Sequence, residues 1–158
     1  MLKGSILLSI YHREKPSYLE LALNSILRSS EIISEVIIVK DGLIPKELSD
    51  VLNEFKLAYE GTVKVIGYSK NKGLGFALNY GLKHCSNEIV FRVDGDDVNR
   101  TDRFSIQYSL LISNPHLSIV GGQIEEFDKS PGDIGRLRTV PISSAVITNI
   151  IKLRNPFN

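Results

Sequence analysis

Three carboxylate side chains stand within four residues of this chain, at Asp94, Asp96 and Asp97. They follow directly on residues 88–93 (EIVFRV), whose apolar, β-prone side chains predict a strand that ends where the acids begin. Like charges this close repel one another, and a fold tolerates them where a cation or a row of hydrogen-bond donors neutralises them. In open α/β sheets, ligands bind at the carboxyl ends of the strands. The first hypothesis is therefore a divalent metal ion that holds phosphate oxygens.

The rest of the sequence alternates between short apolar runs and amphipathic stretches, and this pattern predicts the sheet that would carry such a site. The predicted strands are 5–10, 35–40, 63–66, 88–93, 117–120 and 123–127. The predicted helices are 16–27, 45–59, 74–84, 103–113 and 143–153, and the polar residues 128–138, which include glycine and proline, predict a loop. Strands that alternate with helices form βαβ units. We therefore expect an α/β fold with a mostly parallel sheet flanked by helices.

Length, charge and cysteine content exclude several classes of protein. The 158 residues are the size of one domain, and the 19 basic and 18 acidic side chains nearly cancel, which argues against a DNA or RNA partner. No apolar run approaches the ~20 residues of a membrane span, and the N-terminus lacks the layout of a secretory signal. Cys85 is the single cysteine, which excludes an internal disulfide and suits a reducing cytoplasm.

Other motifs compete for the glycines and aspartates of this chain. Residues 73–75 (GLG) begin like a dinucleotide fingerprint, but Leu78 stands where a third glycine or alanine is needed. There is no GxxxxGK[ST] stretch, and the residues at 98 and 99 do not fit an EF-hand loop. Residues 94–98 also fit DxDx[TV], the motif of haloacid-dehalogenase-type phosphatases, in which the first Asp is a nucleophile. In that family the motif normally follows the first strand, whereas here it follows about the fourth.

The order and spacing of several blocks carry a further resemblance. The blocks are SIYHR at 9–13, IIVKDG at 37–42, NKGLGFALNYGL at 71–82, DGDD at 94–97, Arg103 with Gln107, and Asn114 with Pro115. Together they make the chain, from Ser5 onward, resemble the N-terminal, nucleotide-sugar-binding part of family-2-type glycosyltransferases of the GT-A fold. The members that it resembles act in bacterial surface-polysaccharide synthesis.

This resemblance implies a GT-A (Rossmann-like) fold and a metal-dependent glycosyltransferase that inverts the anomeric centre. The donor would be a nucleoside-diphosphate sugar, with UDP as the expected nucleotide, and the cofactor would be Mg²⁺ or Mn²⁺. The acceptor would be a saccharide or a lipid-linked saccharide of surface polysaccharide or lipopolysaccharide. No nucleic-acid partner is implied. The implied location is cytoplasmic, with peripheral contact to the cytoplasmic face of the inner membrane left open, and oligomeric state is not predicted.

The resemblance also assigns roles to individual residues. Asp41 would accept an N–H of the base, and Asp96 would contact the metal directly, with Asp97 as a second ligand. Gly73 would let the backbone approach the ligand closely. The full set implied to bind the nucleotide sugar is Ser9, Tyr11, Arg13, Asp41, Gly73, Asn79, Asp94 and Asp96.

Several of these residues have a structural interpretation as well. Tyr11 is equally well explained by core packing, Arg13 by solvation at the surface and Asn79 by a bond to backbone within its helix. Asp41 stands before a glycine, and Asp-Gly is a strong turn signal. Asp97 taken alone is equally well explained as the N-cap of the following turn.

The sequence departs from the family pattern at one position and ends before the family's later blocks. Leu78 stands where family members often carry arginine, which leaves diphosphate binding to the metal, Lys72 or an unseen segment. We expect a single glycosyltransferase-like domain over 1–158, with a nucleotide-binding part at 1–100 and the start of an incomplete acceptor part at 101–158. The catalytic residue of an inverting enzyme is a general base, expected here beyond Asn158. This piece alone would then bind nucleotide weakly with metal and transfer little or no sugar.

Two further classes stay open. One is a catalytically silent nucleotide-binding or interaction module. The other is a sugar nucleotidyltransferase, which also combines an α/β sheet with metal-binding acids. The latter should carry a glycine-rich, basic loop after the first strand, and residues 11–16 contain no glycine.

Overall fold

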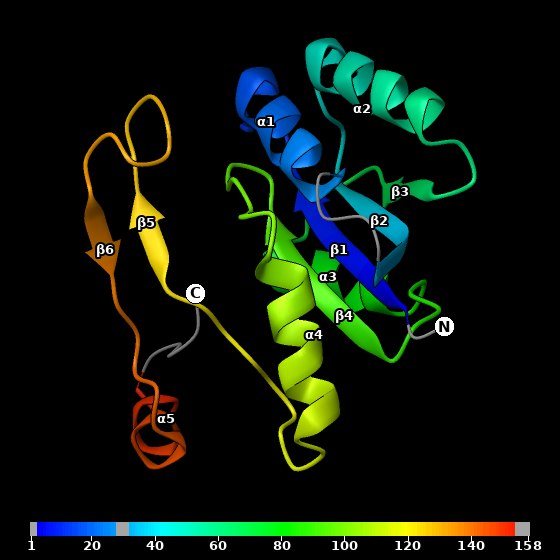
Figure 1. Ribbon diagram of the computed structural model, residues 1–158. Helices are drawn as coiled ribbons and strands as arrows, with labels where there is room; N and C mark the ends of the chain where they lie inside the picture. Colours follow the sequence, from blue (N-terminus) through cyan, green and yellow to red (C-terminus); the bar gives the residue numbers. More distant parts are fainter. Residues whose placement is uncertain (1–2, 28–31, 154–158) are drawn as a thin grey trace. The chain divides into compact units, whose positions relative to one another are not determined.

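The computed structural model describes residues 3–27 and 32–153 (Figure 1). Residues 154–158, the end of the stretch that resembles the family, lie outside the described residues. The chain divides into two compact units, 1–108 and 109–158. The helix α4 (Arg103–Ser113) contains the point of division.

A four-stranded parallel sheet forms the centre of the first unit. Its strands are β1 (Gly4–Ile10), β2 (Ile33–Asp41), β3 (Val63–Tyr68) and β4 (Ile89–Asp94), in the spatial order β3-β2-β1-β4. Consecutive strands are connected through α1 (Pro16–Leu27), α2 (Lys46–Ala58) and α3 (Leu74–Leu82). The strand order reverses at β1, because β2 and β3 lie on one side of it and β4 on the other. The α/β prediction is confirmed, and the reversal is the kind of switch point at which such sheets bind ligands.

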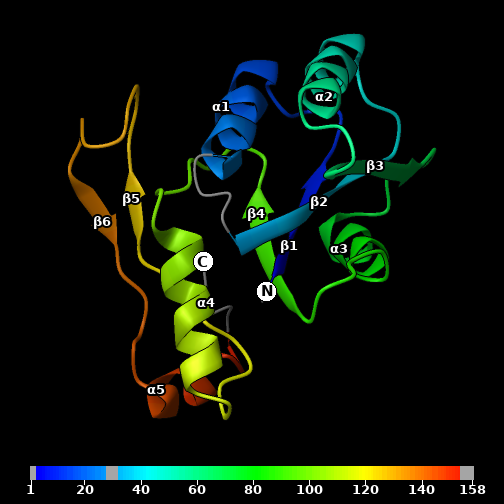
Figure 2. The same cartoon turned by 45° about the vertical axis from the view of Figure 1, so that its right-hand side comes forward.

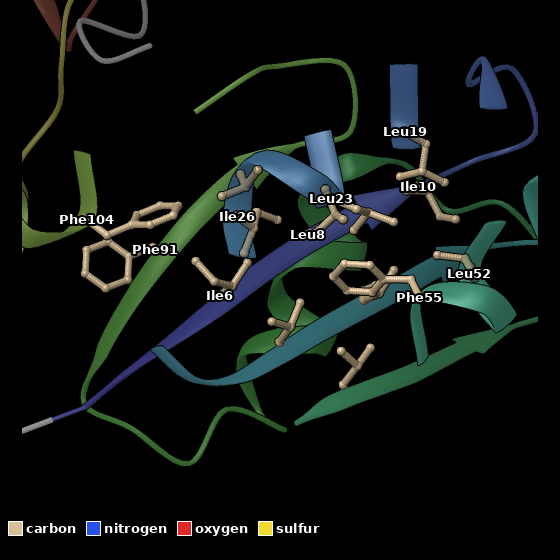
Figure 3. Packing of buried hydrophobic residues seen from close by; sticks show 14 of the residues in the cluster. Ile6, Leu8, Ile10, Leu19, Leu23, Ile26, Leu52, Phe55, Phe91 and Phe104 are labelled. Atoms are coloured by element: carbon tan, nitrogen blue, oxygen red, sulfur yellow. The ribbon is translucent and has the colours of Figure 1, made fainter. Parts of the chain in front are cut away.

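The two faces of this sheet are covered differently, because alternate residues of each strand point to opposite faces. One face is covered by α1 and α2 (Figure 2), and apolar side chains of β1, β2 and β4 pack there against these helices (Figure 3). Its largest fully buried members include Ile6, Leu8, Ile10, Leu19, Leu23, Ile26, Ile38 and Phe104. On the other face, called the α3 face below, the buried Leu7, Ile37 and Val39 pack against Ala77 of α3. Within the described part of the first unit, α3 is the helix that packs on this face, over β1 and β2.

Helix α3 lies close to the sheet because Gly81 has no side chain. A Cβ atom at this position would lie 2.4 Å from Leu7 Cδ1 and 2.6 Å from Val39 Cγ2. Real Cβ atoms do not approach other heavy atoms this closely, so a larger residue would force these two buried side chains or the helix to shift. The glycine thus sets the height of α3 above the sheet, and with it the position of the loop that precedes the helix.

A buried polar network lies at the amino end of the sheet, on the α3 face. The carboxylate of Glu35 accepts hydrogen bonds from the Ser5 hydroxyl (2.5 Å) and from the backbone N–H and hydroxyl of Ser86. The amide of Asn87 donates to the Ser5 hydroxyl (2.9 Å), and Lys64 Nζ lies 3.6 Å from Glu35 Oε2. Burial of Glu35 raises its pKa, but the hydrogen bonds from Ser5 and Ser86 outweigh it and hold the pKa below the ordinary value of 4.5.

This network makes the stability of the first unit sensitive to acid. A carboxylate whose pKa is lower in the folded chain contributes stability above its unfolded pKa and loses it as the pH falls through the folded pKa. As the pH is lowered below about 4.5, we expect the urea midpoint of Glu35→Gln to fall less steeply with pH than that of the wild type. Glu54→Gln, on the exposed side of α2, is the control and should follow the wild type. Equal slopes for all three chains would contradict this role of Glu35.

The second unit contains a small antiparallel sheet and a short helix. Strands β5 (Ile124–Glu126) and β6 (Arg136–Arg138) pair with Glu126 opposite Arg136, and α5 (Ser144–Ile150) follows. Glu126 forms ion pairs with Arg136 (3.2 Å) and Arg138 (2.7 Å). These cross-strand pairs stabilise a sheet whose strands are only three residues long.

Two sequence predictions are wrong in this unit. Residues 117–120 do not form a strand, and Leu117 instead donates its backbone N–H to the carbonyl of Asn114 in a turn (2.9 Å). An apolar run becomes a strand only when another strand pairs with it. The loop predicted at 128–138 contains β6, because the ion pairs to Glu126 hold an exposed Arg-Leu-Arg segment in a strand.

Candidate functional site

Four polar side chains gather at the carboxyl edge of the α3 face. Every second residue of a strand lies on this face, and the last ones are Ser9 of β1, Asp41 of β2, Tyr68 of β3 and Asp94 of β4. Ser9 is paired with Asp94, and Asp41 with Tyr68, in the register of the strands. Neighbouring strands are about 4.8 Å apart and rise about 3.3 Å per residue. Ser9 is paired with Val39 on β2 and with Asp94 on β4, so Asp41 lies two residues beyond this level and about 12 Å from Asp94. The fold thus brings Ser9, Asp41 and Asp94 to one edge, at the switch point.

Asp41 anchors the loop that precedes α3. Its Oδ1 accepts hydrogen bonds from the Tyr68 hydroxyl (2.9 Å) and the Lys72 N–H (2.7 Å), and its Oδ2 accepts one from the Gly73 N–H (2.9 Å). The amide of Asn71 donates to the Asp41 carbonyl (3.1 Å), and Asp41 is 3% exposed. Since a carboxylate oxygen can accept about two hydrogen bonds, Oδ2 keeps a free lone pair among the bonds formed by the described residues. The contact between Asp41 and a base stays a prediction.

Two glycines shape the same loop through their backbone conformations. Gly42, directly after Asp41, has φ +89°, and a Cβ there would lie 2.7 Å from the backbone nitrogen of Asn71. Gly73 has φ +88°, and no atom lies within 4 Å of the position that its Cβ would take. Positive φ favours glycine at both positions. The open space at Gly73 is compatible with the close ligand approach predicted from the sequence.

An aromatic cluster on β3 and α3 borders the loop and was not predicted from the sequence. The Tyr68 ring packs edge-on against Phe76 and Tyr80, with centroids 5.3 and 5.4 Å apart. Lys72 Nζ lies 4.2 Å from the centroid of Phe76 and 5.3 Å from that of Tyr68. Burial, together with the hydrogen bond to Asp41, raises the pKa of Tyr68 to about 12. Tyr68 therefore stays a neutral donor, and the rings hold a lysine ammonium beside the edge.

The acidic turn, residues 94–97, begins where β4 ends. Asp94 is half-buried and is held by Arg92, whose guanidinium lies 2.7 and 3.0 Å from the two carboxylate oxygens. Asp96 is exposed. Asp97 is exposed too, but desolvation by its neighbours, and then the charges of Asp94 and Asp96, raise the pKa of its carboxyl. The Asp97 carboxylate accepts no hydrogen bond from the described residues, so its interpretation as the N-cap of the following turn is wrong. The charge of Asp94 is thus paired with Arg92, whereas Asp96 and Asp97 form no ion pair with the described residues.

A fourth carboxylate, Glu14, lies beside this turn and was also missed by the sequence analysis. It belongs to the loop between β1 and α1 and is half-buried. Burial, followed by the charges of Asp96 and Asp94, raises the pKa of Glu14. A Cβ added to Gly95 would lie 3.8 Å from Glu14 Cδ. The only sequence signal was its position shortly after the first strand, which does not reveal the pairing of β1 with β4.

The remaining predicted residues lie on the surface near these elements. Tyr11 is 38% exposed and packs edge-on against His12, with centroids 5.5 Å apart, so its interpretation as a core residue is wrong. Arg13 is exposed in the same loop, and Asn79 is exposed on α3. Leu78, the departure from the family pattern, packs against the apolar cluster of the α3 face. A role for Tyr11, Arg13 or Asn79 in binding stays a prediction.

The carboxylates of the acidic turn are candidate ligands for Mg²⁺ or Mn²⁺. Among residues 3–27 and 32–153, no group of three His, Cys, Asp or Glu side chains could hold a metal by itself. These cations commonly take one or two carboxylates and complete their shell with substrate phosphates and water. The exposed Asp96, with Asp97 beside it, offers this donor set. The residues present fit a metal that arrives together with a phosphate ligand.

Known proteins with this arrangement are glycosyltransferases of the GT-A fold. The mannosyltransferase PcManGT from Pyrobaculum calidifontis superimposes with a TM-score of 0.63 and 17% identity, over 77% of this chain and 34% of that one. TarS from S. aureus, in a complex with UDP, gives a TM-score of 0.60 and 22% identity, over 71% of this chain and 32% of that one. At these identities the likeness concerns the fold.

Sequence relatives add the family. The sequence model of "Glycosyl transferase family 2" matches residues 5–156, and the chain belongs to that family. It is 37% identical to the Escherichia coli UDP-Gal:alpha-D-GlcNAc-diphosphoundecaprenol beta-1,3-galactosyltransferase, over 99% of this chain and 56% of that protein. It is 34% identical to the amylovoran biosynthesis glycosyltransferase AmsE of Erwinia amylovora, over 98% of this chain and 56% of that protein. The family and fold class predicted from the sequence are confirmed, and the chain spans about half the length of these relatives.

Proposed function

We propose that this chain is the donor-binding part of an inverting, metal-dependent glycosyltransferase that uses a UDP sugar. The observation that carries the proposal is the meeting of Ser9, Asp41 and Asp94 at one edge of the sheet, with the acidic turn beside them. A nucleotide laid across this edge would have its base near Asp41 and its phosphates near the turn. The separation of about 12 Å between Asp41 and Asp94 suits a nucleoside placed in this way.

Each group at the edge has a chemical task in this reaction. Asp41 and Gly73 would position the base and ribose, while Asp96 and Asp97 would hold the metal at the diphosphate. When bound, the metal supplies positive charge that stabilises the leaving nucleoside diphosphate. Inversion also requires a carboxylate that takes the proton of the acceptor hydroxyl. We place that base in the part of the relatives that this chain does not span, and we expect little sugar transfer from these residues alone.

The names of the relatives support a proposal for the acceptor and the cellular location. The E. coli relative is named for a diphosphoundecaprenol-linked acceptor, and AmsE for amylovoran biosynthesis. We propose a saccharide or lipid-linked acceptor in surface-polysaccharide synthesis, with residues 1–100 binding nucleotide and 101–158 beginning the acceptor part. No helix in the described ranges is both long and apolar enough to cross a membrane. A cytoplasmic location, with contact at the cytoplasmic face of the inner membrane, belongs to the same proposal.

Asp96→Ala tests the metal-dependent part of the site. Calorimetry should show that Mn²⁺ raises the affinity of the wild-type chain for UDP. With Asp96→Ala, the factor by which Mn²⁺ raises this affinity should be about tenfold smaller, because a ligand to the metal is lost. Asp50→Ala, which breaks an exposed ion pair with Lys46 on α2, is the control and should bind like the wild type. If the wild-type chain bound no UDP, or if Asp96→Ala bound UDP and Mn²⁺ as the wild type does, the result would instead support a silent module.

A further inference from the structure

The acidic turn must be held in place although its charges repel one another. Residues 95–102, between β4 and α4, contain no helix or strand. Within the turn, the backbone bond from the Asp97 N–H to the Asp94 carbonyl is long, at 3.4 Å. So weak a bond does not fix the direction of three carboxylates. The side chains that reach the turn from α1 and α4 must therefore do more of this work.

Arg103, the first residue of α4, bonds to the chain on both sides of the turn. One terminal nitrogen of its guanidinium donates to the carbonyl of Arg92 on β4 (3.0 Å), and the other donates to the side-chain oxygen of Asn99. Its Nε donates to Gln107 one helical turn later (3.3 Å). A single planar group thus joins the strand before the acids to the segment after them.

Asn99 passes this constraint to α1. It is 6% exposed, and both its backbone N–H and its side-chain amide donate to the hydroxyl of Ser25 (2.9 Å each). Ser25 is 4% exposed and donates in turn to the carbonyl of Ala22 (2.6 Å). The hydroxyl therefore accepts two bonds and donates one. The far end of the turn is fixed to a helix that is itself packed on the sheet.

We propose that Arg103 is a positioning residue, which acts through Asn99 and Ser25 to hold Asp96 and Asp97 in the arrangement that a metal–diphosphate ligand requires. This inference rests on the proposed function. Arginine suits the task because its rigid fork donates in several directions at once, whereas the single ammonium of lysine cannot meet the carbonyl of Arg92 and the amide of Asn99 together. A charge-conserving substitution should therefore fail at this position.

The test compares Arg103→Lys with Arg100→Lys. Arg100 lies in the same segment but forms an exposed pair with Asp102 (2.7 Å) and serves as the matched control. Calorimetry would measure UDP binding with and without Mn²⁺. With Arg103→Lys, the factor by which Mn²⁺ raises the affinity for UDP should be about tenfold smaller than in the wild type, while the affinity without metal is kept. Arg100→Lys should match the wild type in both measurements. Retention of the full gain by Arg103→Lys would overturn the proposal.

Amide hydrogen exchange supplies a readout that needs no ligand. Hydrogen exchange at the backbone N–H of Asn99 should be about tenfold faster in Arg103→Lys than in Arg100→Lys. Ser25→Ala should also accelerate this exchange, because it removes the hydroxyl to which that N–H donates. Unchanged exchange in Arg103→Lys would overturn the anchoring. A wild type that binds UDP equally with and without Mn²⁺ would overturn the proposed function. If exchange in Arg103→Lys were nevertheless faster in that case, Arg103 would stabilise the local structure only, and its positioning role would be overturned.

Discussion

Replacing Asp41 with alanine is expected to lower the free energy of unfolding by about 3–5 kcal/mol and to abolish UDP binding. The carboxylate is buried and accepts three hydrogen bonds, from Tyr68, Lys72 and Gly73. Hydrogen bonds to a charged acceptor contribute about 1.5–3 kcal/mol each, and donors left without a partner add a desolvation cost. Because the three bonds share one group, their contributions will not simply add. Urea denaturation and calorimetry with UDP would measure the two effects.

Two milder variants separate stability from ligand contact. Tyr68→Phe removes one of the three donors to Asp41 and should cost about 1 kcal/mol while it leaves UDP binding largely intact. Asp41→Asn keeps one acceptor oxygen but turns amide hydrogens toward the N–H groups of the loop, and should lie between the wild type and Asp41→Ala. If Asp41→Ala were as stable as the wild type, the loop would not depend on this carboxylate.

Gly81→Ala is expected to destabilise the chain by about 1–3 kcal/mol, because its Cβ would lie well inside contact distance of Leu7 and Val39. The same substitution at Gly75, also in α3, meets no atom within 4 Å. Alanine is a better helix former than glycine, so Gly75→Ala should stabilise the chain by up to about 1 kcal/mol. Urea midpoints of the two variants should therefore move in opposite directions.

The outcome also bears on the proposed binding of UDP at the carboxyl edge of the sheet. An outward shift of α3 would displace the loop that Asp41 holds, so Gly81→Ala should weaken UDP binding more than its loss of stability alone explains. A Gly81→Ala chain with the stability of Gly75→Ala would show that α3 moves freely on the sheet.

Local pattern was enough to predict the first unit of the fold. The apolar runs around Leu7, Ile38 and Val93 are strands because the sheet buries them, and their ends are set by polar residues such as Asp41 and Asp94. Strand ends could be read along the chain, so the acids that follow them could be named as candidates. The sequence did not reveal which strand lies beside which, and the reversal of strand order at β1 emerged only in the structure.

The parts of the site that escaped prediction depend on that pairing. Tyr68 reaches Asp41 because β3 lies next to β2, and Glu14 meets the acidic turn because β1 lies next to β4. Arg103 was noticed as part of a family block, but its bonds to Arg92 and Asn99 could not be inferred from spacing. Residues 117–120 show the opposite failure, since a suitable composition without a neighbouring strand produced no strand.

The central place of β1 has a consequence for the order in which the chain can fold during synthesis. Its first edge pairs with β2 soon after translation, whereas its second edge must wait for residues 89–94. Until then a growing chain exposes an unpaired strand edge, the kind of surface at which nascent proteins associate wrongly. Such distant contacts also slow folding. The acidic turn enters with the strand that closes this edge, so the candidate site and protection from misassembly are acquired in the same step.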